Sequence, residues 1–136
     1  QDRYKGYQDA LHDRGIPLNP EWIVEGDFSE ISGYLAMRRL LQARVDAVFA
    51  ASDAMAFGAM RAIKEADLVI PGDIAVVGFD DIPLAAISNP PLTTVRQPIL
   101  RSGSLAAETL IDMIERPDPQ PRRVILPTEL VIRASS

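Results

Sequence analysis

The amino acids that this sequence lacks exclude several kinds of chemistry. It contains no cysteine, so neither disulfide bonds nor thiolate chemistry is available to it. The single histidine, His12, has no partner at metal-ligand spacing, and we expect it to be a surface residue with no metal site nearby. The sequence has no Walker loop, no dinucleotide-binding glycine motif and no nucleophile elbow. We therefore expect neither a cofactor nor an enzymatic activity.

Excess basic charge and long hydrophobic runs are also missing. The chain has 14 Lys plus Arg against 19 Asp plus Glu, and its net charge of -5 argues against binding nucleic acid by charge alone. No segment approaches the ~18 unbroken apolar residues of a membrane helix, so we expect no membrane partner, and a cytoplasmic location is compatible with the composition. With 136 residues, of which 47% are hydrophobic and 24% charged, the chain has the size and composition of about one globular domain.

The hydrophobic pattern alternates between segments typical of helices and of strands. We predict helices at residues 4–14, 31–41, 53–66 and 102–114, and strands at residues 21–24, 45–51, 74–79, 92–95, 123–126 and 129–133. Proline is concentrated in the last third, where residues 117–121 are predicted to form a stiff turn. The strands at 45–51 and 74–79 are almost continuously apolar, which favours an α/β fold with a parallel sheet covered by helices on both faces.

Polar and aromatic side chains follow three of the predicted strands. Phe28 follows the first, Ser52 and Asp53 follow the second, and Asp80 and Asp81 follow the third. Ligands bind at this edge of open α/β sheets, where carboxylates can accept hydrogen bonds from sugar hydroxyls. A purely structural role is the alternative after each strand. Phe28 could be a core aromatic, Asp53 a helix N-cap, and Asp80 and Asp81 turn-forming residues. Spacing alone leaves open whether this is a binding protein or an enzyme.

Five ordered motifs resemble the effector-binding region of the LacI/GalR family of bacterial transcriptional regulators. They are R-Y-K-G-Y at 3–7, G-D-F followed by S-G-Y within 26–34, F-A-A-S-D-A-M-A at 49–56, I-P-G-D-I-A-V-V-G-F-D-D at 70–81, and P-P-L-T-T-V-R-Q-P at 90–98. The resemblance extends from Arg3 to Arg133. It implies the C-terminal half of a two-lobed, periplasmic-binding-protein-like core. Because the chain begins inside a predicted helix, we expect it to be a fragment.

The resemblance also implies how the chain is divided between the two lobes. Residues 1–97 and 123–136 would belong to the C-terminal lobe, as a β-α-β layer, and residues 98–122 would provide a crossover and a helix of the N-terminal lobe. The hinge is expected at Val95, Gln97 and Pro98. The implied function is binding of a sugar-like effector that modulates operator binding by a helix-turn-helix outside this sequence. The alternative, which shares the fold, is a periplasmic sugar-binding protein of a transporter.

Four positions match family positions that contact the effector: Arg3, Phe28, Ser52 and Asp80. The chemistry is suitable, because an arginine can donate in a fork, a phenyl ring can stack and a carboxylate can accept. The sequence departs from many sugar-responsive members at Ser52, where they carry asparagine. A hydroxyl is shorter than an amide and offers fewer hydrogen bonds. Asp53 is interpreted as the structural cap of the helix that follows.

A dimer interface is predicted from the helix at 53–66. Its small and apolar side chains share one face: Met55, Ala59, Ala62, Ile63 and Ala66. Phe57 lies nearly opposite them, and the apolar segment at 82–87 is expected to be a loop. Exposed apolar groups of this kind need a cover, so we predict a homodimer centred on Phe57, with Leu84, Ala86 and Ile87 nearby. The resemblance places the family's dimer contact at the same positions. The alternative is that Phe57 packs within its own chain.

Overall fold

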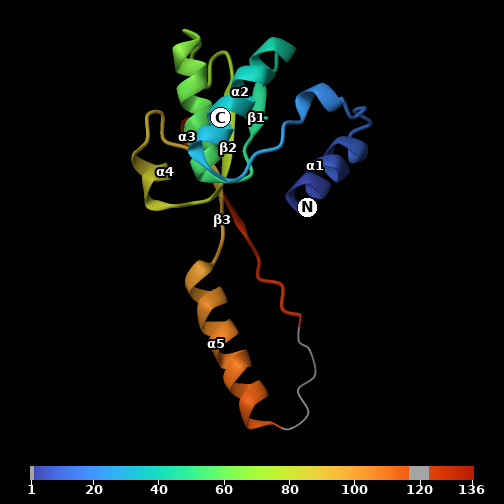
Figure 1. The fold of residues 1–136 in the computed structure, drawn as a ribbon, viewed down its shortest axis with the longest axis vertical. Coiled ribbons are helices and arrows are strands. Elements are labelled where there is room, and N and C mark those ends of the chain that lie inside the picture. Colours follow the sequence, from blue (N-terminus) through green and yellow to red (C-terminus); the bar gives the residue numbers. More distant parts are fainter. Residues whose placement is uncertain (1, 117–122) are drawn as a thin grey trace.

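The computed structural model describes residues 2–116 and 123–136 (Figure 1). Its helices are α1 (Asp2–Asp13), α2 (Glu30–Leu40), α3 (Asp53–Glu65), α4 (Pro83–Ile87) and α5 (Ile99–Glu115), with short 3-10 turns at Pro20–Trp22 and Leu41–Ala43. Its strands are β1 (Ala47–Phe49), β2 (Ala75–Asp80), β3 (Thr93–Arg96) and β4 (Glu129–Val131). The predicted helices near 4–14, 31–41, 53–66 and 102–114 are thus confirmed, as are four of the predicted strands.

The four strands form one sheet in the order β1-β2-β3-β4. β1, β2 and β3 are parallel, with Val48 opposite Val76 and Gly78 opposite Thr94. β4 returns antiparallel beside β3, placing Glu129 opposite Arg96. The predicted α/β class with a parallel sheet is therefore confirmed. The carboxyl ends of β1, β2 and β3 lie at one edge, where the predicted ligand residues follow them.

The hydrophobic core lies between one face of the sheet and the helices α2 and α3. It includes Met37, Ile63, Val76 and Leu92, which are almost fully buried. α2 and α3 approach closely because glycines face backbone across their contact: a Cβ at Gly33 would lie 2.1 Å from the Met55 carbonyl oxygen. The second face is less well covered than predicted. α1 lies beside it without a single buried residue, and Phe49 of β1 is 41% exposed.

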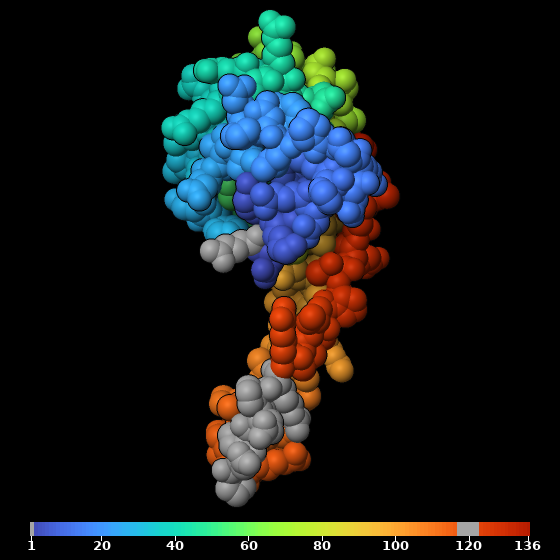
Figure 2. All heavy atoms as spheres, turned by 90° about the vertical axis from the view of Figure 1, so that its right-hand side faces the viewer, coloured from blue at the N-terminus to red at the C-terminus, as the bar shows by residue number. Residues whose placement is uncertain are grey.

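α5 and residues 123–128 project away from the sheet, and we call them together the arm (Figures 1 and 2). The arm is joined to the sheet through β3 and β4. α5 has a strongly amphipathic sequence but no buried residue; Leu100 is 89% and Ile114 76% exposed. The apolar face of α5 thus makes little contact with the other described residues.

Three predictions about individual segments are wrong. Residues 21–24 form no strand, because Asn19 caps a 3-10 turn that begins at Pro20, its side chain accepting from the Glu21 amide at 3.0 Å. Residues 123–126 pair with no strand either, since β3 ends at Arg96 and offers a partner only from Glu129 onward. The segment 82–87 is the short helix α4 rather than a loop. The turn predicted at 117–121 lies outside the described residues.

Candidate functional site

Three of the four predicted effector residues lie together at the carboxyl edge of the sheet. Arg3 comes from α1, Phe28 from the turn before α2, and Asp80 from the end of β2. The Arg3 guanidinium carbon lies 4.1 Å from the centre of the Phe79 ring and 5.6 Å from that of Phe28. Its Nη2 is 3.8 Å from Asp80 Oδ1. The predicted convergence of Arg3, Phe28 and Asp80 is therefore seen in the fold.

This cluster is accessible to solvent. Phe28 is 56% exposed, which rules out its alternative role as a core aromatic. The side chains of Arg3 and Asp80 are 32% and 27% exposed, so their ion pair is open to competition from a polar ligand. An aromatic face beside a cation and a carboxylate offers both stacking and paired hydrogen bonds. That combination is suited to a polyhydroxylated ring.

Gln97 is a further member of the cluster. Its side-chain amide donates to Asp80 Oδ1 at 2.6 Å, so the carboxylate that faces Arg3 is already held from the end of β3. The sequence indicated Gln97 only as a hinge residue. Gln97 could have been found from the pairing of the strands. Asp80 lies opposite Arg96, so Gln97, the residue after Arg96, reaches the same edge of the sheet.

Ser52 is placed differently from the other three residues. It is only 5% exposed and is the N-cap of α3, where its hydroxyl accepts from the Met55 amide at 3.2 Å. The same hydroxyl lies 3.5 Å from the Phe28 carbonyl oxygen, to which it donates. These bonds engage the hydroxyl within the chain. Ser52 therefore supports the turn that carries Phe28.

The predicted capping role of Asp53 is wrong, because Ser52 occupies the cap. Asp53 is instead completely buried. Its Oδ1 accepts from the Thr94 hydroxyl at 2.5 Å and its Oδ2 from the Ile82 amide at 2.9 Å. Burial raises the pKa of Asp53, while the bonds from Thr94 and Ile82 lower it in part. A Cβ at Gly78 would lie 2.3 Å from Asp53 Oδ1, so only glycine leaves room for this carboxylate.

Asp81 faces away from the ligand cluster. Its Oδ2 accepts from Arg96 Nε at 2.6 Å and its Oδ1 from Arg133 Nη2 at 2.7 Å. Burial alone would raise the pKa of Asp81, but the hydrogen bonds from Arg96 and Arg133 outweigh it and hold this pKa below its usual range. The turn-forming role considered for this residue agrees with its positive φ of 59°. Its two arginine partners could not be predicted from the sequence.

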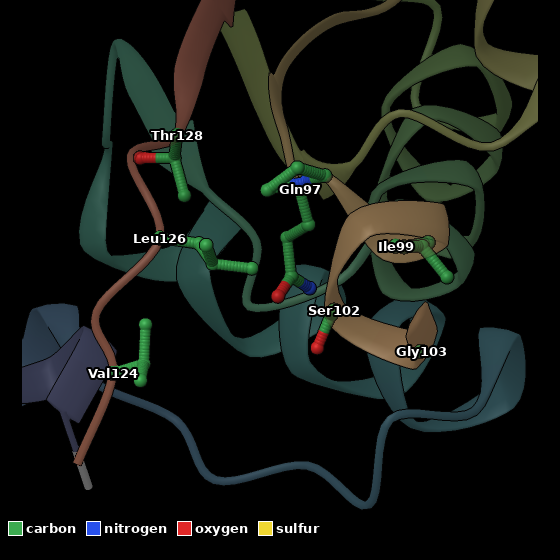
Figure 3. A pocket seen from close by; sticks show the side chains of 8 residues that line it. Gln97, Ile99, Ser102, Gly103, Val124, Leu126 and Thr128 are labelled. Carbon is green, nitrogen blue, oxygen red and sulfur yellow. The ribbon is translucent and has the colours of Figure 1, made fainter. Parts of the chain in front are cut away.

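A hollow of about 450 Å³ lies beside the cluster, at the base of the arm (Figure 3). Gln97, Ile99 and Ser102 line it on the α5 side, and Val124, Leu126 and Thr128 on the other. Gln97 thus borders both this hollow and the Asp80 carboxylate. Of the predicted hinge residues, Gln97 and Pro98 lie between β3 and α5, whereas Val95 lies inside β3, opposite Leu130.

Three of the four predicted interface residues are exposed, and the fourth, Phe57, is half-buried. Leu84 and Ile87 of α4 are 48% and 79% exposed, and Ala86 beside them is exposed too. Phe57 is half-buried and packs against the core cluster, so part of its ring is covered within the chain. Of the residues predicted to share one apolar face of α3, Met55, Ala59, Ala62 and Ile63 are buried, but Ala66 is exposed.

Residues 2–116 and 123–136 contain neither a candidate metal site nor a candidate membrane-spanning helix. No group of three or more His, Asp or Glu side chains is arranged there to hold a metal ion. None of the helices in those ranges is both long and apolar enough to span a bilayer.

Comparison with known proteins places the whole chain in one family. Residues 1–136 match the periplasmic binding protein-like domain. The ribose operon repressor of Haemophilus influenzae is 43% identical over 99% of this chain and 41% of its own length. The regulator CelR of Thermobifida fusca is 40% identical over 98% of this chain and 40% of its own length. The chain thus spans about two fifths of these relatives.

Solved structures agree with the sequence comparison. A transcriptional regulator CelR–cellobiose complex superposes with a TM-score of 0.95 at 40% identity, covering 98% of this chain and 42% of that one. A LacI-family regulator from Enterococcus faecium with bound ribose gives 0.91 at 34% identity, covering 98% and 50%. These relatives are named as repressors and regulators, not as enzymes or transporter components.

Proposed function

Because this chain belongs to the family of periplasmic binding protein-like domains, in its LacI-type branch, we propose that it is the effector-binding part of a transcriptional regulator. In this proposal the complete protein works in the cytoplasm and binds operator DNA through a helix-turn-helix outside this sequence. A sugar or related metabolite bound at the carboxyl edge of the sheet changes that affinity. Regulators rather than transport proteins among the relatives favour this function over the transporter alternative.

The observation that carries the proposal is the cluster of Arg3, Phe28 and Asp80. Its guanidinium, carboxylate and exposed ring come from three separate elements and meet at the edge where α/β sheets bind ligands. The arginine donors can bind ring oxygens or hydroxyls, the carboxylate can accept from two hydroxyls, and Phe28 can cover an apolar ring face. Ser52 supports this arrangement from beneath Phe28 rather than by touching the ligand.

The division into lobes is proposed as the family resemblance implied it. Residues 1–97 and 123–136 form the C-terminal lobe, and residues 98–122 belong to the N-terminal lobe. The exposed apolar face of α5 supports this division, since a helix with Leu100 and Ile114 facing water needs a cover. Gln97 and Pro98 then form one of the chain segments that connect the two lobes at the hinge.

We also propose a homodimer formed through α3 and α4. The exposed side chains of Leu84 and Ile87 give the apolar centre, and the half-buried ring of Phe57 borders it. A two-fold axis would bring each of these side chains into the interface twice.

Calorimetry on the complete natural protein tests the ligand site. A panel of pentoses, hexoses and disaccharides that includes D-ribose and cellobiose is titrated into wild type and into Asp80→Asn. We expect at least about tenfold weaker binding in the variant, because one charged acceptor is lost. Asp9→Asn, which removes the exposed Lys5–Asp9 pair on α1, is the matched control and should bind as wild type does. Unchanged affinity in Asp80→Asn, or no sugar bound by wild type, would overturn the proposal.

A further inference from the structure

Two adjacent carboxylates at the end of β2 have separate sets of partners. Asp80 faces the ligand cluster, where Arg3 lies 3.8 Å away and Gln97 donates at 2.6 Å. Asp81 has no partner in that cluster and is bound by Arg96 and Arg133. One peptide unit therefore separates the proposed effector contact from a second, unassigned ion-pair network.

The second network holds both strands that lead to the arm. Arg96 is the last residue of β3, and Arg133 follows the end of β4. Each arginine binds a different oxygen of Asp81, at 2.6 Å and 2.7 Å. Arg133 also donates to the Leu92 carbonyl oxygen at 2.8 Å, which ties it to the start of β3. The Asp81 carboxylate thus links the arm end of β3, through Arg96, to the residue Arg133 that follows β4.

The Asp81–Arg133 pair is better shielded from water than the pair at Asp80, whereas the Arg96 side chain is 48% exposed. The side chain of Asp81 is 7% exposed and that of Arg133 16%, against 27% for Asp80 and 32% for Arg3. Charge-assisted bonds in such surroundings are stronger than exposed ones, and removing one partner leaves the others uncompensated. The arm is therefore attached firmly at Asp81, while the neighbouring Asp80 stays open to a ligand.

The backbone that joins the two carboxylates is strained. Asp80 has a φ of 121° and Asp81 a φ of 59°, both in the left-handed region that non-glycine residues avoid. Such conformations cost energy and persist only where the surrounding bonds hold them in place. Here the bonds come from both sides, through Gln97 at Asp80 and through the two arginines at Asp81. A change in the partners of one carboxylate therefore alters the forces on the other.

We propose that Asp81 is a positioning residue that sets the angle of the arm and couples it to ligand binding at Asp80. The inference rests on the proposed function, because it takes Asp80 as an effector contact. A sugar that displaces Gln97 or Arg3 from Asp80 changes the strained pair of residues, and Asp81 passes this change to β3 and β4. The arm then turns as one body with its strands.

The test measures the angle of the arm by the distance between two spin labels. Arg39→Cys on α2 and Glu108→Cys on the polar side of α5 are exposed positions, and this sequence has no cysteine of its own. The labels are placed in the complete natural protein, with any cysteine outside this sequence replaced by serine. Distance distributions are recorded by double electron-electron resonance, first without sugar, for wild type, Asp81→Asn and Arg96→Gln. They are recorded again with D-ribose or cellobiose, whichever wild type binds.

Without sugar, we expect the distance distribution of wild type to have one narrow peak. In Asp81→Asn, also without sugar, this narrow peak should be lost. Arg96→Gln, which removes an exposed partner and should fold, is expected to give an intermediate width. Two controls should keep the narrow peak: Glu129→Gln, which removes only the outer partner of Arg96, and Met37→Ala, which lowers the melting temperature through the core between α2 and α3.

A wild-type peak in both Asp81→Asn and Arg96→Gln would overturn the inference, as would equal broadening in Met37→Ala. If a sugar moves the wild-type peak, the same sugar should leave the distribution of Asp81→Asn unmoved, and an equal movement in the variant would overturn the coupling. The sugar-free spectra distinguish this inference from the proposed function. If wild type binds no sugar but Asp81→Asn still loses the narrow peak, the proposed function fails while the positioning role of Asp81 stands.

Discussion

The Thr94 hydroxyl donates a 2.5 Å hydrogen bond to the Asp53 carboxylate, and both residues are completely buried. The bond joins the first turn of α3 to the middle of β3. The other carboxylate oxygen accepts from the Ile82 amide, directly before α4. One buried acid thus connects both helices of the proposed dimer interface to the sheet.

Asp53 should make the stability of the fold depend on pH in a defined direction. Burial raises its pKa in the folded state above the value of 3.8 expected for an exposed aspartate. The folded state therefore holds this proton more tightly, and the contribution of Asp53 to stability falls as pH rises from 3.8 through the raised pKa. Asp53→Asn has no such titration.

Urea denaturation at about pH 4 and about pH 7 checks this effect. Wild type should lose stability relative to Asp53→Asn between the two values. The lowered pKa of Asp81 acts in the opposite direction, giving stability that is lost as pH falls, but it is common to both proteins and cancels in the difference. A difference that is the same at both pH values would contradict the prediction.

The contact between α2 and α3 should not tolerate a side chain at Gly58. A Cβ there would lie 1.9 Å from the Glu30 carbonyl oxygen, so Gly58→Ala has to separate the helices and should cost at least ~1–3 kcal/mol of unfolding free energy. Gly103→Ala is the matched control, because nothing lies within 4 Å of its Cβ position in α5. It should stabilise the chain by about 0.5–1 kcal/mol. Thermal denaturation compares the two, and equal effects would refute the packing argument.

The proposed interface should be sensitive to charge on α4. Ile87→Asp places a carboxylate on a side chain that is 79% exposed, so the fold should survive while dimerisation is lost. Sedimentation of the complete protein measures this, with Ile31→Asp on the 68% exposed Ile31 of α2 as the control. Phe57→Asp should also give monomers, but its half-buried ring makes some loss of stability expected as well. A stable dimer in Ile87→Asp would remove α4 from the interface.

This chain by itself should not bind duplex DNA. Its net charge is -5, and neutralising phosphates with Lys and Arg supplies most non-specific affinity. A gel shift with the 136-residue chain at moderate salt should show free DNA only, whereas the complete protein should shift an operator fragment. Micromolar binding by the chain would contradict the prediction.

Much of the α/β architecture could be predicted because it follows from local patterns. Strands β1 and β2 are continuous apolar runs, and α3 between them has a helical repeat, so a parallel pair with a crossover followed from the sequence. Arg3, Phe28 and Asp80 could be found because they occupy recognisable motifs next to these elements. The strand predicted at 21–24 failed because Asn19 and Pro20, directly before it, favour a capped turn.

Tertiary structure alone decided which side chains are buried in α2. Its large apolar residues Ile31 and Leu35 are 68% and 54% exposed. The buried residues of α2 are Gly33, Ala36, Met37 and Leu40, and at Gly33 the backbone of α3 lies so close that no side chain fits. Hydrophobicity in the sequence carries no information about the distance between two helices.

The sequence by itself determined the fold class, the family and the residues at the sheet edge, since each depends on neighbours along the chain. The roles of Ser52, Asp53 and Asp81 depend on partners far away in sequence. Asp53 meets Thr94 across 41 positions, and Asp81 meets Arg133 across 52. The sequence records an aspartate in the same way whether its carboxylate caps a helix, binds a ligand or holds two strands together. Only the folded chain brings it the donors that decide between these roles, because hydrogen bonds require approach within about 3 Å.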